Sequence, residues 1–239
     1  TLVGAHRLPG AGKLAEALLA AEPRLVAVWE NSGPAEYGAY GGNWQLLGGE
    51  EDLLDELAGI RLAVAPAAFT QVHPAQAARL YQVAGAFAQA DETAELLDLY
   101  CGLGGVGLAL AGPKTRLTGV ESYAPAVAAA KRNALLNAKE DALFYMGKAE
   151  DVLPRLAAAG IAPQVAVLDP PRSGCEEGAL AALIRLSPQR IVYISCAPAT
   201  LARDLKYLFA AGYGLAQAQP VDMFCQTAHV ETCVLMSRE

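Results

Sequence analysis

The chain has 239 residues, of which 54% are hydrophobic and 18% are charged. This composition is typical of a globular protein with a substantial core and excludes a disordered or fibrous protein. The formal net charge of −7 disfavours a nucleic-acid binder that works by bulk charge, so an RNA ligand would need a local basic patch or a further segment. No apolar run approaches the roughly 20 residues of a membrane helix. We therefore expect a cytoplasmic monomer without membrane contact.

The five cysteines include no CxxC pair. This spacing predicts neither a metal site nor a disulfide framework, and reduced thiols are the simpler interpretation.

Residues 1–70 predict a small α+β segment. A helix is expected over Lys13–Ala21, and strands over Leu25–Trp29 and Ile60–Ala65. The glycine-rich stretch 37–44 predicts a hairpin turn. These elements are too few to close a core alone, so we interpret residues 1–70 as the remnant of a truncated central domain and residues 71–239 as a catalytic domain.

From Pro74 onward, short apolar strands alternate with helices. Pro74 suits the first position of a helix that runs to Gln89. The alternation predicts an α/β fold with a doubly wound, mostly parallel, seven-stranded Rossmann-like sheet. The expected strands are Glu95–Tyr100, Arg116–Glu121, Ala142–Gly147, Val165–Asp169, Arg190–Ser195 and an antiparallel His229–Met236 at or near the edge. The expected helices are Gly105–Ala111, Ala124–Asn137, Glu176–Leu186 and Ala199–Ala211.

A glycine pattern follows the first strand of this sheet. Gly102, Gly104 and Gly107 have GxGxxG spacing, which lets the backbone approach a ligand at a helix N-terminus. Glu121 ends the next strand, where a carboxylate can bind ribose hydroxyls. These features fit a dinucleotide or S-adenosylmethionine. Asp98 favours S-adenosylmethionine, because an acidic residue before the glycines serves no purpose in phosphate binding.

Two further strands end in residues suited to chemistry. Asp169 begins the sequence DPPR, and Cys196 follows the strand Arg190–Ser195. Ligands of such sheets bind beyond the carboxyl ends of the strands, so both should face one crevice. A buried structural thiol is the alternative for Cys196. A thiol beside a helix N-terminus can, however, have a lowered pKa.

A carboxylate lies at the start of the last apolar strand. Alternation would place His229 and Glu231 on one face. Exposure at a sheet edge is one interpretation of Glu231, and a general base with a raised pKa in the crevice is the other.

At these positions the chain resembles the RNA uridine-5-methyltransferases. The matching segments follow the family's order over residues 60–236. They are FTQVHP at 69–74, DLYCGLG at 98–104, GVE at 119–121, DPPR at 169–172, SCAPATLARD at 195–204 and DMFCQTAHVE at 222–231.

The resemblance implies that S-adenosylmethionine is the cofactor, bound by Gln71, Tyr100, Glu121 and Asp169 together with the glycine loop. It implies that Cys196 is the nucleophile, adding to carbon 6 of uracil. It also implies that Glu231 removes the proton from carbon 5 to form 5-methyluridine. The similarity of the residues within the motifs favours 23S ribosomal RNA as the substrate over transfer RNA.

The chain departs from the family's pattern at three positions. Ala197 stands where an Asn usually follows the nucleophile, His73 where an Asn usually caps the helix, and Cys225 where a Pro is usual. The first departure bears on the positioning of uracil. Family members also usually carry an N-terminal RNA-binding module or an iron–sulfur cluster. Neither is recognised here, so we interpret the chain as a fragment or a shortened variant.

Three other functions compete with this one. An amino-group methyltransferase would use the DPPR sequence without Cys196. A nicotinamide-dependent dehydrogenase would use the glycine loop. An RNA-binding module without catalysis is the non-enzymatic alternative, and the net charge of −7 argues against it.

Overall fold

The computed structural model of the protein describes residues 1–37, 40–66, 68–89 and 95–238. These residues form two compact units, one of residues 1–55 and 63–68 and the other of residues 56–62 and 69–239. None of the helices in the described part of the chain is both long and apolar enough to cross a membrane.

The first unit contains a three-stranded sheet with one helix. Its elements are β1 (Leu2–Gly4), α1 (Ala11–Ala21), β2 (Ala27–Tyr37) and β3 (Tyr40–Gly49). The strand order is β1-β2-β3, and α1 packs on β2 and β3. The predicted hairpin is therefore present, but most of the stretch expected to turn lies in β3. Residues 38–39 lie outside the described residues. A second hairpin follows, β4 (Leu53–Leu57) and β5 (Ile60–Val64).

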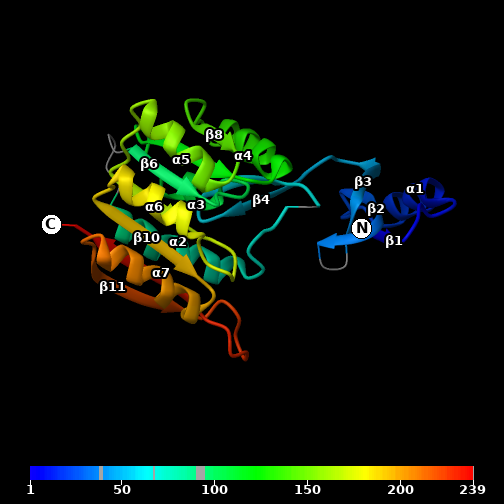
Figure 1. The fold of residues 1–239 in the computed structure, drawn as a ribbon. Helices are drawn as coiled ribbons and strands as arrows, with labels where there is room; N and C mark the ends of the chain where they lie inside the picture. Colours follow the sequence, from blue (N-terminus) through cyan, green and yellow to red (C-terminus); the bar gives the residue numbers. More distant parts are fainter. Residues whose placement is uncertain (38–39, 67, 90–94, 239) are drawn as a thin grey trace. The chain divides into compact units, whose positions relative to one another are not determined.

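The larger unit is a seven-stranded sheet between two layers of helices (Figure 1). Its first half comprises α2 (Pro74–Ala88), β6 (Glu95–Leu99), α3 (Gly105–Leu110), β7 (Arg116–Glu121), α4 (Ala124–Leu136) and β8 (Leu143–Met146). Its second half comprises α5 (Ala149–Ala158), β9 (Val165–Leu168), α6 (Glu177–Leu186), β10 (Arg190–Ser195), α7 (Pro198–Ala210), β11 (Gly214–Val221) and β12 (Glu231–Ser237).

The strand order is β11-β12-β10-β9-β6-β7-β8, and only β12 runs antiparallel to its neighbours. The chain winds outward in one direction from β6 and in the other from β9. The crevice between these two central strands is the switch point at which such sheets bind ligands. This topology confirms the predicted fold class.

Both faces of the sheet are covered by apolar side chains. Helices α5, α6 and α7 pack over one face, where Leu97, Ile191 and Val234 join a core with Leu153, Leu183 and Leu208. Helices α2 and α3 lie on the other face (Figure 1). Burial on both faces explains why the central strands are nearly continuous apolar runs.

Two elements of this unit were not predicted. Helix α5 contains Pro154, which suggests a helix break, but its buried side chains Val152, Leu153 and Leu156 stabilise it in place. Strand β11 is exposed over most of its length and contains Pro220, as an edge strand permits. The predicted final strand is second from the edge, with β11 outside it.

Candidate active site

The carboxyl ends of the central strands bring the predicted residues together by register. Leu99 pairs with Leu168, so Tyr100 and Asp169 leave β6 and β9 side by side. Ser195 of β10 pairs with Thr232 of β12. Because this pair is antiparallel, the residue after Ser195 and the residue before Thr232 lie opposite each other. These residues are Cys196 and Glu231.

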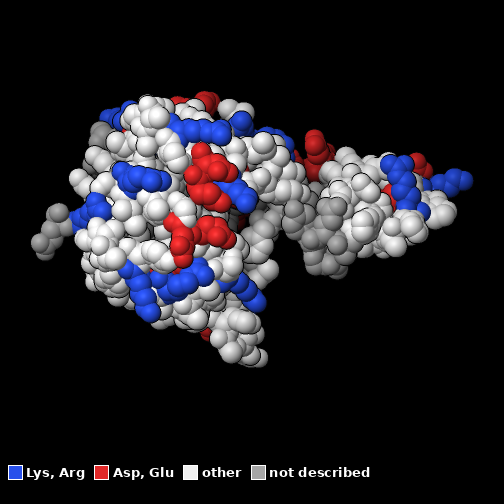
Figure 2. All heavy atoms as spheres, in the orientation of Figure 1, with Lys and Arg blue, Asp and Glu red and all other residues white. Residues whose placement is uncertain are grey.

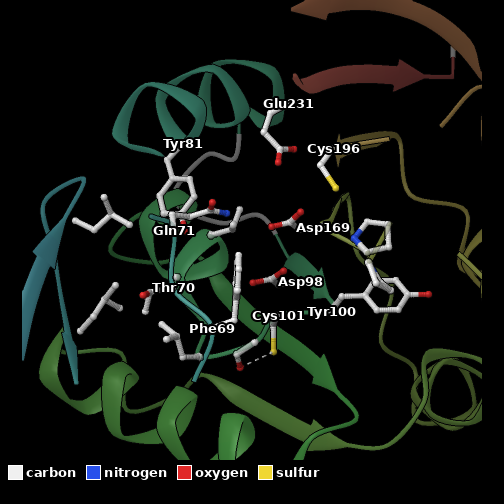
Figure 3. Close-up of a pocket in the computed structure, with 18 of the residues that line it drawn as sticks. Phe69, Thr70, Gln71, Tyr81, Asp98, Tyr100, Cys101, Asp169, Cys196 and Glu231 are labelled. Atoms are coloured by element: carbon white, nitrogen blue, oxygen red, sulfur yellow. Dashed lines mark hydrogen bonds between the residues drawn. The ribbon is translucent and has the colours of Figure 1, made fainter. Parts of the chain in front are cut away.

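A cavity of about 430 Å³ opens at this edge of the sheet. Its lining includes four of the predicted cofactor residues, Gln71, Tyr100, Gly102 and Asp169, and both predicted catalytic residues, Cys196 and Glu231. Figure 3 shows the Cys196 sulfur and the Glu231 carboxylate directed into the cavity near Asp169.

The remaining predicted cofactor residues lie just behind the lining. Glu121 accepts hydrogen bonds from the backbone N–H groups of Gly102 at 3.1 Å and Tyr123 at 2.7 Å. Gly104 is the N-cap of α3, with φ of 85°. It shapes the loop while its neighbours Gly102 and Gly105 line the cavity.

Tyr100 reaches away from the centre of the cavity. It has φ of 62°, and its hydroxyl lies near the Cys175 thiol. Figure 3 shows its ring turned away from Gln71 and Tyr81. Its contribution to the cavity therefore comes from its backbone and the near side of its ring.

The charged groups that line the cavity are three carboxylates, those of Asp98, Asp169 and Glu231, and the guanidinium of Arg172. Burial raises the pKa of Asp98 to about 8 and that of Asp169 to about 7. Negative charges nearby add to both shifts. Oδ1 of Asp98 has no hydrogen-bond partner among the described residues. Such a cavity suits a positively charged ligand, which would relieve the repulsion between the carboxylates.

Glu231 is 6% exposed, and its Oε2 has no hydrogen-bond partner in the described structure. Burial raises the pKa of this carboxyl, and the charge of Arg172 opposes the shift. The expectation of an exposed edge carboxylate is therefore wrong. His229 does not share its face, because β12 begins only at Glu231 and His229 lies in the exposed segment before it.

The thiol of Cys196 is partly exposed to the cavity. We expected the N-terminus of the following helix to lower its pKa. Instead, burial and the nearby charge of Glu231 raise the pKa, although Arg172 opposes this. The expectation failed because it considered α7 alone and neither the burial of the thiol nor the carboxylate contributed by β12.

Two further lining residues were not assigned to the site from the sequence. Tyr81 was placed among the apolar residues of its helix, but its side chain lines the cavity beside Gln71 (Figure 3). Asp98 was used only to interpret the glycine loop. Its Oδ2 accepts a hydrogen bond from the N–H of Gly107 at 2.8 Å. For Tyr81, the signal available in the sequence was a polar hydroxyl on the otherwise apolar face of its helix.

The residue at the usual cap position of α2 performs that role. Nδ1 of His73 accepts a hydrogen bond from the N–H of Gln76 at 3.3 Å, and Pro74 begins the helix. The substitution of His for the usual Asn therefore preserves the cap, and with it the start of α2 next to Gln71.

A family-wide sequence profile described as tRNA (Uracil-5-)-methyltransferase matches residues 59–239. A Bacillus cereus protein named "Uncharacterized RNA methyltransferase" is 40% identical over 232 residues, which are 97% of this chain and 50% of the relative. A similarly named protein of Halalkalibacterium halodurans is 39% identical over 232 residues, 97% of this chain and 51% of the relative. The chain thus spans about half the length of these relatives.

Among solved structures, the chain is similar to the Pyrococcus abyssi tRNA (uracil-54, C5)-methyltransferase, crystallised in complex with S-adenosyl-L-homocysteine. The TM-score is 0.73 at 26% sequence identity, and the match covers 89% of this chain and 51% of that one. Precorrin-6y C5,15-methyltransferase from Geobacter metallireducens, at 13% identity and a TM-score of 0.58, shares the fold.

Proposed function

The chain belongs to the tRNA (uracil-5-)-methyltransferase family, and from this premise we propose that it methylates carbon 5 of a uridine in RNA, with S-adenosylmethionine as the cofactor. The observation that carries the proposal is the placement of Cys196 opposite Glu231 on the wall of one cavity. A structural cysteine or an edge carboxylate would not need this arrangement.

The cavity fits S-adenosylmethionine in charge as well as in position. Bound there, this cofactor supplies a methyl group activated by a positively charged sulfur. Asp169 and Gln71 are proposed to hold it from the cavity wall, and Glu121 beside Gly102 is proposed to bind its ribose. The unpartnered Oδ1 of buried Asp98 supports a cationic ligand, because a positive charge beside it would lower the cost of ionising this buried group.

The chemistry needs an enzyme nucleophile, because carbon 5 of uracil alone is too weakly nucleophilic to attack a methyl group. The Cys196 thiolate adds to carbon 6, which makes carbon 5 an enolate-like centre. Carbon 5 then attacks the methyl group, whose bond to the sulfonium sulfur would break and leave S-adenosylhomocysteine. Glu231 then takes the proton from carbon 5, and the bond between sulfur and carbon 6 breaks to release the product. A base with a raised pKa holds that proton well.

The substrate uridine must leave its stack to reach this cavity, at a cost of about a few kcal/mol. Loops and single-stranded sites therefore suit the enzyme better than regular duplex. On the face of the catalytic unit drawn in Figure 2, Lys and Arg side chains form separate groups with acidic side chains between them. This face lacks a continuous basic stripe, so we infer that few phosphate contacts form there.

The arguments for the RNA class point in two directions. The residues within the motifs favour 23S ribosomal RNA, whereas the description of the matching family and the name of the Pyrococcus abyssi relative specify transfer RNA. We retain ribosomal RNA as the proposed substrate, and transfer RNA is the second arm of the experiment.

The decisive experiment incubates the chain with S-adenosylmethionine and RNA that contains 5-fluorouridine. Fluorine at carbon 5 cannot leave as a proton, so a covalent complex should accumulate with RNA attached at Cys196. The matched variants are Cys196→Ala, which should give no complex, and Cys225→Ala, which should give as much as the wild type. Mapping the attached nucleotide in ribosomal and transfer RNA identifies the target. Methylation that persists in Cys196→Ala would instead favour an amino-group methyltransferase.

A further inference from the structure

A buried carboxylate on α7 lies outside the cavity used by the proposed chemistry. Asp204 has no exposed surface. Its Oδ2 accepts hydrogen bonds from the N–H of Cys175 at 2.8 Å and the hydroxyl of Tyr193 at 2.6 Å. Its Oδ1 accepts from Nε of Arg203 at 2.8 Å. A buried charge is costly unless it is fully hydrogen-bonded, so this arrangement holds its donors in place.

The same helix holds the loop that follows Asp169. Nη2 of Arg203 donates to the carbonyl oxygens of Ser173 at 2.9 Å and Cys175 at 3.2 Å. The hydroxyl of Thr200 lies 3.1 Å from the carbonyl oxygen of Arg172 and 3.0 Å from that of Ala197, so it shares its one proton between the loop and the start of α7. Side chains from the first two turns of α7 thus contact the backbone of residues 172, 173 and 175.

Gly174 lets this loop close over the helix. Its φ is +77°, and a Cβ at this position would lie 2.5 Å from Oδ2 of Asp204 and 2.6 Å from Nη2 of Arg203. Any larger residue would therefore separate the loop from the carboxylate. The close approach and the hydrogen bonds together form one clamp, defined as Thr200, Arg203, Asp204 and the loop 172–175.

The clamp acts at the active site through Arg172. Arg172 and Cys196 line the same cavity, and the positive charge of Arg172 favours the thiolate form of Cys196. Cys196 also faces the carboxylate of Glu231 on β12, whose charge opposes formation of the thiolate. The balance between one positive and one negative neighbour depends on where the loop places Arg172.

We propose that Thr200, Arg203 and Asp204 are positioning residues that hold loop 172–175 so that Arg172 stays in the cavity that Cys196 lines. The inference rests on the proposed function for its significance, since it assumes that Cys196 is the nucleophile. The geometry predicts a change in thiol reactivity whether or not RNA is the substrate.

The test measures alkylation of Cys196 by iodoacetamide as a function of pH in the 239-residue chain, with peptide mass spectrometry to separate Cys196 from Cys225. Thr200→Val removes the hydroxyl from the Arg172 carbonyl and keeps the side-chain shape. The alkylation rate at pH 7.5 should fall by about threefold to tenfold and the pH profile should move upward, because the thiolate loses part of its positive partner.

Two variants on the same helix serve as controls. Thr200→Ser keeps the hydroxyl and should restore the wild-type profile. Lys206→Ala removes an exposed charge of α7 and should leave the profile unchanged. Alkylation of exposed Cys225, measured in the same digests, should be equal in all proteins. A Thr200→Val protein with the wild-type profile at Cys196 would overturn the proposal.

Asp204→Asn tests the centre of the clamp, and Tyr193→Phe replaces it if Asp204→Asn does not fold. Either should move the Cys196 profile in the same direction. A lower melting temperature with an unmoved profile would reveal a merely structural role and contradict the proposal. If these profiles shift but no fluorouridine complex forms at Cys196, the clamp is supported and the proposed methyltransferase chemistry is not.

Discussion

The backbone N–H of Gly102 donates a hydrogen bond to Oε2 of Glu121 at 3.1 Å, which ties the loop after β6 to the end of β7. The second carboxylate oxygen accepts from the N–H of Tyr123 at 2.7 Å. This oxygen also accepts from the hydroxyl of Ser122 at 3.3 Å, whereas Oε2 keeps a further lone pair. The carboxylate is thus fixed in place, with acceptor capacity left on Oε2 for a ligand hydroxyl.

Replacing Glu121 should weaken cofactor binding. Hydrogen bonds to a charged group contribute about 1.5–3 kcal/mol, so Glu121→Ala should lower the affinity for S-adenosylhomocysteine by about tenfold to a hundredfold. Isothermal titration calorimetry measures this directly. Exposed Glu140 provides the control, since Glu140→Ala removes the same charge away from the cavity lining. Equal affinities of the wild type and Glu121→Ala would contradict the assigned role.

Cofactor binding should strengthen as the pH rises through neutrality. Burial, followed by the charge of Glu231, raises the pKa of Asp169 to about 7. Below that pH the group is neutral, and above it the negative charge attracts a sulfonium. The affinity for S-adenosylmethionine should therefore rise between pH 6 and 8, and the rise should be smaller in Asp169→Asn. Buried Asp98, with a pKa of about 8, contributes the remaining dependence.

The ligand itself provides the control for this prediction. S-Adenosylhomocysteine lacks the sulfonium charge, so its affinity should vary less with pH in the same titrations. If both ligands show the same pH dependence, the carboxylates do not act through the charge on sulfur.

Asp98 should make the protein less stable as the pH rises. Its pKa is raised from 3.8 to about 8, chiefly by burial. Between these values the unfolded chain releases the proton and the folded protein keeps it, so folding stability falls with pH. Asp98→Asn removes this ionisation and should gain about 3–4 kcal/mol relative to the wild type between pH 5 and 8. Urea unfolding of both proteins at pH 5 and pH 8 measures the free energies of unfolding. If their difference is the same at the two pH values, the assigned pKa is wrong.

Much of the site follows from the pattern of the sequence. Parallel strands carry their carboxyl ends to one edge, so Asp169 and Cys196 had to meet there once the alternation of strands and helices was recognised. The placement of Glu231 needed the antiparallel register of β12, which alternation suggested and pairing with β10 confirmed. The roles of these residues came from the family resemblance and stay predictions.

Other features depend on contacts between distant residues and could not be predicted. In the sequence, Asp204 is one charged residue of an amphipathic helix. Its hydrogen-bond donors Cys175 and Tyr193 come from other parts of the chain. The raised pKa of Cys196 depends on burial and on Glu231, which lies 35 positions later in the sequence. Strand β11 has an exposed face that carries no burial pattern to detect.

The cap of α2 gives a prediction about stability. Nδ1 of His73 accepts from the N–H of Gln76, so His73→Ala should destabilise the protein by about 1 kcal/mol through loss of the cap. His73→Asn restores the usual family residue and should be at least as stable as the wild type. Thermal unfolding at pH 8 compares the three proteins. An unchanged melting temperature in His73→Ala would show that the 3.3 Å contact contributes nothing.

A comparison of two glycines, Gly160 after α5 and Gly174 in the loop 172–175, distinguishes the cost of backbone strain from that of a steric clash. Gly160 and Gly174 have nearly equal φ values of +81° and +77°. A Cβ on Gly160 would meet no atom within 4 Å, whereas one on Gly174 would lie 2.5 Å from Oδ2 of Asp204. Both Ala variants therefore incur the cost of a left-handed conformation, about 1 kcal/mol. Only Gly174→Ala must also displace the buried carboxylate.

Gly174→Ala should consequently destabilise the protein by about 2 kcal/mol more than Gly160→Ala, a difference typical of disrupting a buried hydrogen-bond network. Urea unfolding of both variants gives the comparison at one pH. Because the left-handed strain cancels between them, the difference reports on the contact with Asp204 alone. Equal stabilities would mean that the loop moves away from α7 at no cost, which is incompatible with a carboxylate held by three donors.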